Sequence, residues 1–581
     1  MGDNENRKVY EARPVKNYRE MVEYSCKNYA QNIAYKYKKD YTAKNVEYIE
    51  KTYEQVGKDI KAFGTGLLNL DLMGERIVVV GKNRYEWCIS YLATTCSNMV
   101  IVPIDKALPD VEMQRLIERS EATAIIFDEK YLETVKKVQE KENSSLKILI
   151  CMDDIKEKGI KTFNEVLEEG RKQILAGDQK YDSIEIDENK MSIMLFTSGT
   201  TNEPKAVMLS QGNICANISN IACWVKLYPT DVLLSFLPIH HTFECTITFL
   251  YGFYSGSQVA FCDGLKHIQQ NLKEYKVSVF VAVPLVLETM YKKIQKAIEE
   301  QGKTGLINKM TKISNTLLKA KIDIRKIVFK QILDNFGGHL RVVLYGAAPM
   351  NKATIIGYNN LGISLIQGYG LTETSPVVTA ETDKEKRPGS IGLALANLNL
   401  KIENPDNEGV GEITVKGPSV MLGYYKNPEE TKKVLKDGWF STGDYGYKDK
   451  DGFVYITGRK KDIIVLKNGK NVYPQEIEFL INKIPYVAES LVYSRDKDTT
   501  DTMLCAKIVY DKDAIKQMIG EKTEEEYKEI IWQEVKNINQ ELPIFKKIKN
   551  ITITTEKTDG KGGVFWHTQG SGKSLSMVFY A

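Results

Sequence analysis

Long apolar runs are missing from this chain of 581 residues. None reaches the roughly 18–20 residues that a helix needs to cross a bilayer. The nine cysteines contain no C-x-x-C pair, and no secretory signal is visible. These absences argue against a membrane span and against a disulfide framework. We therefore expect reduced thiols and a cytoplasmic location, with peripheral membrane association left open.

A surplus of charge of one sign is also missing. The chain has 80 Lys and Arg against 76 Asp and Glu, a net charge of +4. Such a balance excludes a general field for binding polyanions, so we expect no nucleic-acid partner. Apolar residues make up 43% and charged residues 27%, as in ordinary globular proteins. The chain is too long for one ordinary hydrophobic core, so its length predicts two or more domains.

Short apolar runs alternate with helical stretches in the first part of the chain. A helical pattern spans 53–68, and the strand-like runs are 76–81, 100–104, 124–127, 147–150 and 341–345. This alternation predicts an α/β fold with mixed, largely parallel sheets in a large N-terminal domain. Strand-like runs at 491–493 and 505–510, after a predicted helix start near 472–478, indicate a small α+β unit.

A loop of small hydroxyl residues lies between two predicted strands, 193–196 and 207–210. Its backbone N–H groups, hydroxyls and single ammonium could bind an anion. It differs from the G-x-x-x-x-G-K-[S/T] phosphate loop because no helix-opening Gly-Lys-Ser follows. By itself, the loop could equally be a polar turn with a surface lysine. Its candidate anion ligands are Thr197, Ser198, Gly199, Thr200, Thr201 and Lys205.

Four further motifs follow this loop in a fixed order. They are Gly346-Ala347-Ala348-Pro349, Tyr369-Gly370-Leu371-Thr372-Glu373-Thr374, Ser441-Thr442-Gly443-Asp444 and Gly458-Arg459-Lys460-Lys461-Asp462. Together the five stretches resemble the adenylate-forming enzymes: acyl-CoA synthetases, luciferases and peptide-synthetase adenylation domains. The resemblance covers about residues 10 to 557.

The resemblance implies a nucleotide site. The hydroxyl-rich loop with Thr197 and Lys205 would grip the pyrophosphate end of ATP. Gly346, Ala347 and Ala348 would flank the adenine, and Tyr369, next to Gly370, would stack on it. Thr372 would bind the α-phosphate and Glu373 would hold Mg²⁺, a hard cation that prefers carboxylate and phosphate oxygens. Without the resemblance, this is a glycine-rich loop with an exposed glutamate.

The resemblance also assigns residues outside these loops. His241, in Leu237-Pro238-Ile239-His240-His241, would face the acyl carboxylate, although two histidines can simply cap a strand end. Asp444 would bind the ribose hydroxyls, with Arg459 as a second ribose or phosphate contact; the alternative for Asp444 is a turn cap. Lys461 would be the hinge between a domain of residues 1–458 and a mobile lid of residues 459–557. Read alone, Lys461 is one of a basic cluster.

The implied reaction is ATP-dependent activation of a fatty acid, followed by transfer to CoA with release of AMP. The charged helical stretch up to residue 336 resembles an insertion of long-chain fatty acid–CoA ligases, although it also reads as a solvated helix surface. Three alternatives stay open: a nucleotide-binding homologue that has lost adenylation, a ligase for acyl carrier protein or aryl acids, and, from the tail alone, a DNA-translocating ATPase.

The last residues, 558–581, depart from the adenylate-forming pattern. Gly570-Ser571-Gly572-Lys573-Ser574 resembles the ATP-binding motif in the motor subunit of type I restriction enzymes. A working motor also needs a βαβ core and a second acidic motif for Mg²⁺. We therefore expect a foreign tail, joined near 557–561, that binds no ATP productively; the alternative is a genuine variant C-terminus. Because the family's C-terminal lysine is not recognisable, we expect slower adenylation than with the family ending.

Overall fold

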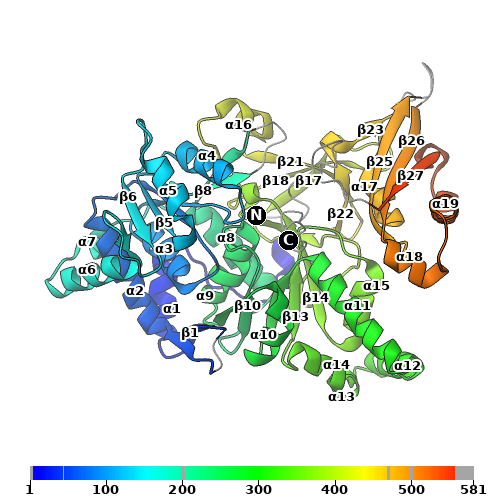
Figure 1. Ribbon diagram of the computed structural model, residues 1–581, viewed down its shortest axis with the longest axis horizontal. Helices are drawn as coiled ribbons and strands as arrows, with labels where there is room; N and C mark the ends of the chain where they lie inside the picture. Colours follow the sequence, from blue (N-terminus) through cyan, green and yellow to red (C-terminus); the bar gives the residue numbers. More distant parts are fainter. Residues whose placement is uncertain (1–3, 43–44, 198–202, 467–470, 497–501, 556–581) are drawn as a thin grey trace. The chain divides into compact units, whose positions relative to one another are not determined.

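The computed structural model describes residues 4–42, 45–197, 203–466, 471–496 and 502–555 (Figure 1). Its described residues divide into two compact units. The first comprises residues up to Asn399 together with Val415–Phe440, and the second comprises Leu400–Thr414 and the residues from Ser441 onward. The predicted boundary at residue 458 marks the expected hinge between two moving domains. The division into compact units does not test it, so it stays a prediction.

Two large sheets organise the first unit. Among the described residues, one sheet has nine strands, in the order β16 (Leu393–Ala394), β15 (Val377–Ala380), β14 (Ser364–Gly370), β13 (Val342–Tyr345), β12 (Val279–Ala282), β10 (Val232–Ser235), β11 (Gln258–Phe261), β1 (Ile33–Lys38) and β2 (Tyr48–Thr52). The other has eight, in the order β19 (Gly423–Tyr424), β9 (Lys205–Ser210), β8 (Met191–Thr197), β4 (Val100–Pro103), β3 (Arg76–Val80), β5 (Ala124–Phe127), β6 (Ile148–Cys151) and β7 (Lys161–Thr162).

Parallel pairing dominates both sheets, which confirms the predicted α/β class. Strands β10 to β14 pair in parallel with one another, as do β3 to β7. The predicted strands at 193–196 and 207–210 form the antiparallel hairpin β8–β9, in which Thr197 lies opposite Lys205. Strand β3 lies between β4 and β5, so the chain reverses its direction of travel across the sheet at this point.

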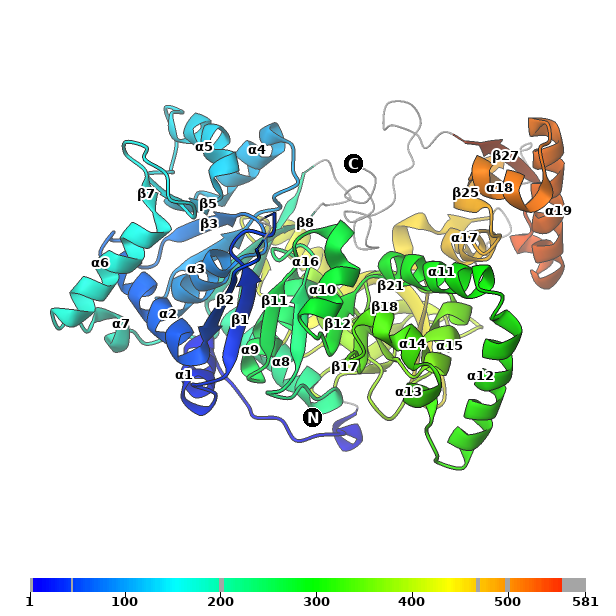
Figure 2. The same cartoon turned by 60° about the horizontal axis from the view of Figure 1, so that its bottom comes forward.

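Helices cover the sheets of the first unit (Figures 1 and 2). The longer ones are α1 (Tyr18–Asn28), α2 (Tyr53–Leu68), α3 (Tyr85–Cys96), α4 (Asp110–Ser120), α5 (Leu132–Gln139), α6 (Phe163–Leu175), α8 (Gln211–Trp224), α11 (Pro284–Glu300), α12 (Thr304–Lys319) and α15 (Lys352–Leu361). Helix α2 begins at a capping box formed by Thr52 and Gln55. It packs closely on α6, since a Cβ on Gly170 would lie 1.8 Å from the carbonyl oxygen of Ala62.

The core of the eight-stranded sheet lies between its strands and helices α4 and α5. Val78, Ile125 and Phe127 pack there against Ile117 and Val135 and are essentially inaccessible to solvent. Continuous apolar strands of this kind are typical of parallel sheets that are buried on both faces.

Besides the two large sheets, the described residues form two further sheets and a strand pair. One sheet contains β17 (Asn399–Glu403), β18 (Gly411–Lys416), β21 (Trp439–Lys448), β20 (Leu435–Lys436) and β22 (Val454–Arg459). The strand pair is β23 (Ile464–Val465) with β24 (Asn471–Val472), and the last sheet holds β25 (Val487–Asp496), β26 (Thr502–Tyr510) and β27 (Asn550–Thr554). Helices α17 (Pro474–Ile481), α18 (Lys512–Ile519) and α19 (Glu524–Glu541) bury Ile477, Ile515 and Ile531 against this last sheet.

Candidate active site

The carboxyl ends of neighbouring parallel strands bring three predicted motifs to one edge of the nine-stranded sheet. The predicted adenine loop, residues 346–349, follows β13, the Tyr369 motif ends β14, and the His241 turn follows β10. A Cβ on Gly346 would lie 2.7 Å from the carbonyl oxygen of Gly368 and 3.8 Å from Cζ of Phe243. Only glycine allows the approach to Gly368, and Phe243, in the turn after His241, lies beside Gly346. Ligands of open α/β sheets bind at such strand ends.

His241 lies in a turn after β10 rather than on the strand. Its backbone N–H donates to the carbonyl of Pro238 at 3.0 Å, and its Nδ1 accepts from the N–H of Phe243 at 3.4 Å. An accepting Nδ1 leaves Nε2 to carry the proton. His241 is exposed, but desolvation by the surrounding protein, and then the neighbouring His240, lower its pKa. His241 is therefore a neutral donor at pH 7.

A second close backbone approach shapes the turn that carries Thr372 and Glu373. A Cβ on Gly370 would lie 1.8 Å from the carbonyl oxygen of Pro376, so this position excludes any other residue in the same conformation. Thr374, buried in the same turn, donates from Oγ1 to that carbonyl at 2.6 Å. The sequence indicated a ligand-binding role for Gly370; the structure adds a packing requirement.

Tyr424 joins this turn to the hairpin that carries the predicted pyrophosphate lysine. Strand β19 pairs with β9, with Tyr424 opposite Val207. The Tyr424 hydroxyl donates to Oε1 of Glu373 at 3.0 Å, and Nζ of Lys205 lies 4.9 Å from the Tyr424 ring centroid. The structure therefore brings Lys205 to the ring and Glu373 to the hydroxyl of one buried tyrosine. Tyr424 was not predicted, because its partners lie far away in the chain.

Glu430, at the start of α16 (Pro428–Val434), forms an ion pair with Lys205. The Nζ–Oε2 distance is 2.6 Å, and the side chains are 15% and 23% exposed. The hydrogen bond from Lys205, with a second from Lys433, lowers the pKa of Glu430 to about 2. Glu430 was missed as well, although Asn427-Pro428 is a recognisable helix start. Lys205 is thus held by an anion at the hairpin.

Thr197 closes the described part of the hairpin, where its Oγ1 lies 3.5 Å from the carbonyl of Lys205. Four predicted ligands lie outside the described residues: Ser198, Gly199, Thr200 and Thr201. The tail 558–581 also lies outside them.

In the second unit, the two predicted ribose residues lie opposite each other. Asp444 of β21 pairs in register with Arg459 of β22, and Arg459 Nε lies 2.7 Å from Asp444 Oδ1. The Asp444 side chain is 4% exposed, so its orientation is fixed by the arginine. Lys461 follows in a short 3₁₀ turn, Lys460–Asp462, and is exposed. Desolvation, then Arg459, lowers the pKa of Lys461.

A buried carboxyl group that the sequence did not reveal lies beneath the His241 turn. Glu244 is fully buried; its oxygens accept from Ser235 Oγ at 2.7 Å and Thr248 Oγ1 at 2.8 Å. Asn83 donates to Ser235 Oγ at 2.9 Å and to the carbonyl of Leu237 at 2.7 Å, so the network holds the start of the turn. Burial raises the pKa of Glu244 to about 8. Glu244 is therefore mostly neutral at pH 7.

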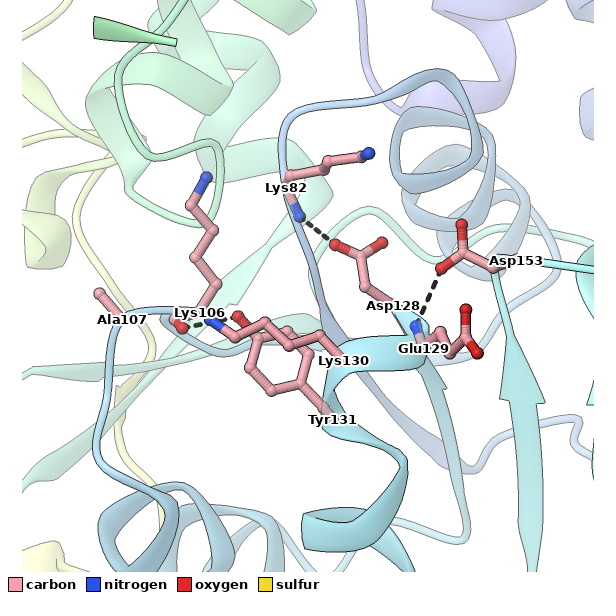
Figure 3. Close-up of a pocket in the computed structure, with 8 residues that line it drawn as sticks. All are labelled: Lys82, Lys106, Ala107, Asp128, Glu129, Lys130, Tyr131 and Asp153. Atoms are coloured by element: carbon pink, nitrogen blue, oxygen red, sulfur yellow. Dashed lines mark hydrogen bonds between the residues drawn. The ribbon is translucent and has the colours of Figure 1, made fainter. Parts of the chain in front are cut away.

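A recess of about 520 Å³ opens at the carboxyl ends of β3, β4, β5 and β6 (Figure 3). Asp128 and Asp153 both bind Arg84, at 3.0 and 2.7 Å. Among the described residues, none of the three lysines that line the recess forms a salt bridge: Lys82, Lys106 and Lys130. Figure 3 shows Lys106 and Tyr131 on one side and the two aspartates on the other.

The recess connects to the His241 turn through Asp105. Oδ2 of Asp105 lies 3.7 Å from Nε2 of His240, and Lys106 is the next residue. Burial lowers the pKa of Lys106. Lysines without carboxylate partners, beside a sheet edge where the chain reverses direction, are suited to an anionic group.

Within the described ranges, no three His, Cys, Asp or Glu side chains converge as metal ligands. The single carboxylate of Glu373 beside a lysine hairpin matches how Mg²⁺ is held by one or two carboxylates plus substrate phosphates. The residues therefore fit Mg²⁺ that arrives with a nucleotide. None of the described helices has both the length and the apolar character required to cross a bilayer.

Known proteins share this architecture. A family model described as AMP-binding enzyme matches residues 22–425, and a model described as SWI2/SNF2 ATPase matches residues 543–581. Long-chain-fatty-acid–CoA ligase 6 of Mus musculus is 30% identical over 492 residues, 80% of this chain and 70% of that protein. The chloroplastic long-chain-fatty-acid–[acyl-carrier-protein] ligase AEE15 of Arabidopsis thaliana is 28% identical, over 84% and 76%.

A solved structure shows the same fold. The anthranilate CoA ligase AuaEII in complex with anthranoyl-AMP superimposes with a TM-score of 0.72 at 17% identity, over 99% of both chains. The chain belongs to the AMP-binding enzyme family, as the ordered motifs predicted. Within that family it is an AMP-forming acid–CoA ligase that uses ATP and CoA. The SWI2/SNF2 match agrees with the prediction that the tail resembles a motor ATPase rather than the adenylate-forming enzymes.

Proposed function

We propose that the protein converts a long-chain fatty acid to its acyl-adenylate and transfers the acyl group to CoA. The similarity to the mouse long-chain ligase over 80% of the chain carries this proposal. In the first step the carboxylate attacks the α-phosphorus of ATP and pyrophosphate leaves. In the second, the CoA thiol displaces AMP. Positioning and charge neutralisation suffice for both, so no protein nucleophile is required.

The first unit would supply most contacts in the first step. Thr197 and Lys205, with the hydroxyl loop, would bind the pyrophosphate end; Gly346, Ala347, Ala348, Tyr369 and Gly370 would hold the adenine. Thr372 would contact the α-phosphate, Glu373 would coordinate Mg²⁺, and the neutral His241 would donate from Nε2 to the acyl carboxylate. The position of Phe243 beside Gly346 supports an acyl site next to the nucleotide.

The second unit would supply the ribose contacts. The Asp444 carboxylate, oriented by Arg459, is suited to accept from two ribose hydroxyls. Lys461, in its exposed turn, would be the hinge on which residues 459–557 rotate between the two half-reactions. A few residues at the end of an element are enough to absorb such a torsion change.

The test of the proposed function is AMP release with ATP, Mg²⁺ and CoA across saturated acids of increasing chain length. We expect kcat/KM to rise with chain length, since each buried CH₂ contributes about 0.8 kcal/mol, roughly fourfold. A preference for aryl or short acids would contradict the long-chain assignment while leaving the ligase class intact.

The recess would hold the phosphate groups of CoA. We predict that Lys106→Gln raises KM for CoA about tenfold, because a charge-assisted hydrogen bond is worth about 1.5–3 kcal/mol. The rate of ATP–pyrophosphate exchange, which needs no CoA, should stay unchanged. Lys137→Gln, an exposed lysine on the neighbouring helix α5, is the control. An unchanged KM for CoA in Lys106→Gln would place the acceptor elsewhere.

Two other candidates each have a supporting observation. The similarity to the AEE15 ligase favours acyl carrier protein as the acceptor, which assays with that protein in place of CoA would reveal. The SWI2/SNF2 match over residues 543–581 favours a nucleotide-binding homologue with lost adenylation. Tight ATP binding without AMP formation would support this second candidate.

A further inference from the structure

Helix α8 carries three buried asparagines on one face. It begins directly after β9, the strand that starts with Lys205. Asn213, Asn217 and Asn220 of this helix are 8%, 0% and 5% exposed. Their spacings of four and three residues put them on the same side of α8. A buried amide costs free energy unless it is hydrogen-bonded, so the partners of each asparagine indicate its role.

Asn217 bonds to the end of the carboxylate turn, our name for residues 371–377, which contain Glu373. Asn217 Nδ2 donates to the carbonyl of Val377 at 2.7 Å, and its Oδ1 accepts from the N–H of the same residue at 3.2 Å. One side chain therefore bonds both backbone groups of Val377, as a neighbouring strand would. This pair of bonds fixes the point where the turn ends and β15 begins.

The carboxylate turn is closed on itself, so it follows the position of Val377. The carbonyl of Pro376 accepts from the N–H of Leu371 at 3.1 Å and from Thr374 Oγ1 at 2.6 Å. The N–H of Thr374 donates in turn to the carbonyl of Leu371 at 3.0 Å. A turn bonded in this way moves as a unit, and Asn217 attaches its C-terminal end to α8.

Asn213 attaches a second segment to the same helix. Its Oδ1 accepts from the N–H of Ser210 at 2.9 Å, as part of the capping box of α8. Its Nδ2 donates to the carbonyls of Pro418 and Val420 at 2.7 and 3.0 Å. This segment continues into β19, which carries Tyr424.

The two attached segments also bond to each other. Ser375 Oγ donates to the carbonyl of Ser419 at 2.8 Å, and the N–H of Met421 donates to the carbonyl of Glu373 at 2.8 Å. Helix α8 thus holds two supports of the Glu373 carboxylate, which are its own turn and the segment that leads to Tyr424. Because α8 continues from β9, both supports are also fixed relative to the strand of the predicted pyrophosphate lysine.

We propose that Asn217 is a positioning residue for Mg²⁺: it fixes the carboxylate turn so that Glu373 meets the metal of Mg·ATP. Residues that orient a metal ligand typically contribute 10–100-fold to metal affinity. Asn220 is a natural comparison, because within the described residues its buried Nδ2 has no hydrogen-bond partner and donates to neither segment. The metal role of Glu373 rests on the proposed function, whereas the attachment of the turn to α8 does not.

The first experiment measures nucleotide binding without turnover. Titration calorimetry of the full chain, with no acid present, gives the Kd for Mg·ATP and the Kd for ATP in EDTA. Asn217→Leu keeps the branched shape but makes no hydrogen bond, so it should raise the Kd for Mg·ATP roughly 10-fold to 100-fold. The Kd for metal-free ATP should change several-fold at most. Asn220→Leu, the matched control, should bind both forms like the unchanged chain.

Hydrogen exchange of the ligand-free chain tests the attachment itself. The amides of Leu371 and Thr374 bond within the turn, so a role limited to satisfying Val377 would leave their exchange unchanged. We expect Asn217→Leu to speed exchange of both amides at least about fivefold, the loss of one net hydrogen bond. Asn220→Leu should leave their exchange as it is in the unchanged chain.

Ser375→Ala is a second, milder variant that keeps every bond of Asn217. It removes the bond to the carbonyl of Ser419 and should raise the Kd for Mg·ATP several-fold. Unchanged exchange of the turn in Asn217→Leu, or equal Kd values for Mg·ATP in Asn217→Leu and Asn220→Leu, would overturn the proposal. Should Asn217→Leu not fold, unchanged Mg·ATP binding by Ser375→Ala would overturn it.

Failure of the proposed function gives a different result. If the unchanged chain binds no Mg·ATP, both the ligase reaction and the metal role of Asn217 are overturned. The exchange measurement, which uses no ligand, then still decides whether Asn217 holds the carboxylate turn. Tight Mg·ATP binding by all variants would instead overturn the positioning role and leave the ligase reaction standing.

Discussion

Replacement of Glu373 by glutamine is expected to slow acyl-adenylate formation on the order of 100-fold. Loss of a single group that stabilises developing charge typically costs that much in kcat. Glutamine keeps an oxygen that can accept from Tyr424, now at 3.0 Å from Glu373, so the turn should keep its shape. What it removes is the negative charge that would hold Mg²⁺ beside the phosphates. ATP–pyrophosphate exchange measures this step directly.

Two further variants separate charge from position. Tyr424→Phe removes the hydrogen bond but leaves the carboxylate, and we expect a loss of several-fold only. Glu429→Gln, on the exposed face of α16, is the matched control and should exchange normally. The Mg²⁺ concentration for half-maximal rate should rise in Glu373→Gln and stay unchanged in Tyr424→Phe. An unchanged Mg²⁺ requirement in Glu373→Gln would exclude Glu373 as the metal ligand.

The second large effect concerns pH and stability. Burial raises the pKa of Glu244 to about 8, against an ordinary value of about 4.3 for glutamate. The folded protein therefore holds a proton on Glu244 that the unfolded chain releases between these two values. The contribution of Glu244 to the free energy of unfolding is fully present below about pH 4.3 and is lost as the pH rises toward 8. Between pH 5.5 and 8 the loss should be about 3 kcal/mol.

Glu244→Gln should not show this loss, because an amide does not titrate. Urea unfolding of both proteins at several pH values tests the prediction, with the free energy of unfolding of the unchanged chain falling relative to Glu244→Gln. Nearby titrating groups cancel in this difference: His240, His241, Cys88, Cys245 and Cys262. Glu54→Gln is the control, since Lys58 lowers the pKa of Glu54 out of this range. Parallel curves would mean that Glu244 is already ionised at neutral pH.

Sequence reasoning was most successful where local pattern decides structure. Continuous apolar runs correctly predicted β3 and β13. The small residues after β13 were assigned to the adenine, and that assignment stays a prediction; the structure shows instead that Gly346 lies close to the carbonyl of Gly368. The fold class followed from the alternation of such runs with helices. These features depend on neighbours within a few residues, which a single sequence displays.

Features created by distant pairing were out of reach. Lys205 and Glu430 are 225 positions apart, and they meet because β19 adds to the edge of the β8–β9 hairpin. Glu244 reads as a polar residue in an apolar run, and only the packing beneath β10 shows that it is fully buried. Tertiary structure decides which polar residues are buried, so a local sequence pattern cannot predict the burial of Glu244.

The ion pair between Lys205 and Glu430 has a consequence for the order of events in a catalytic cycle. In the proposed reaction, the polyphosphate of the incoming nucleotide competes with the Glu430 carboxylate for the Lys205 ammonium. When the inorganic product departs, the same carboxylate recaptures the ammonium, and no bare cation is left in a poorly hydrated place. Glu430 would therefore weaken retention of the product and speed turnover, a gain that an affinity measurement alone would register as a defect.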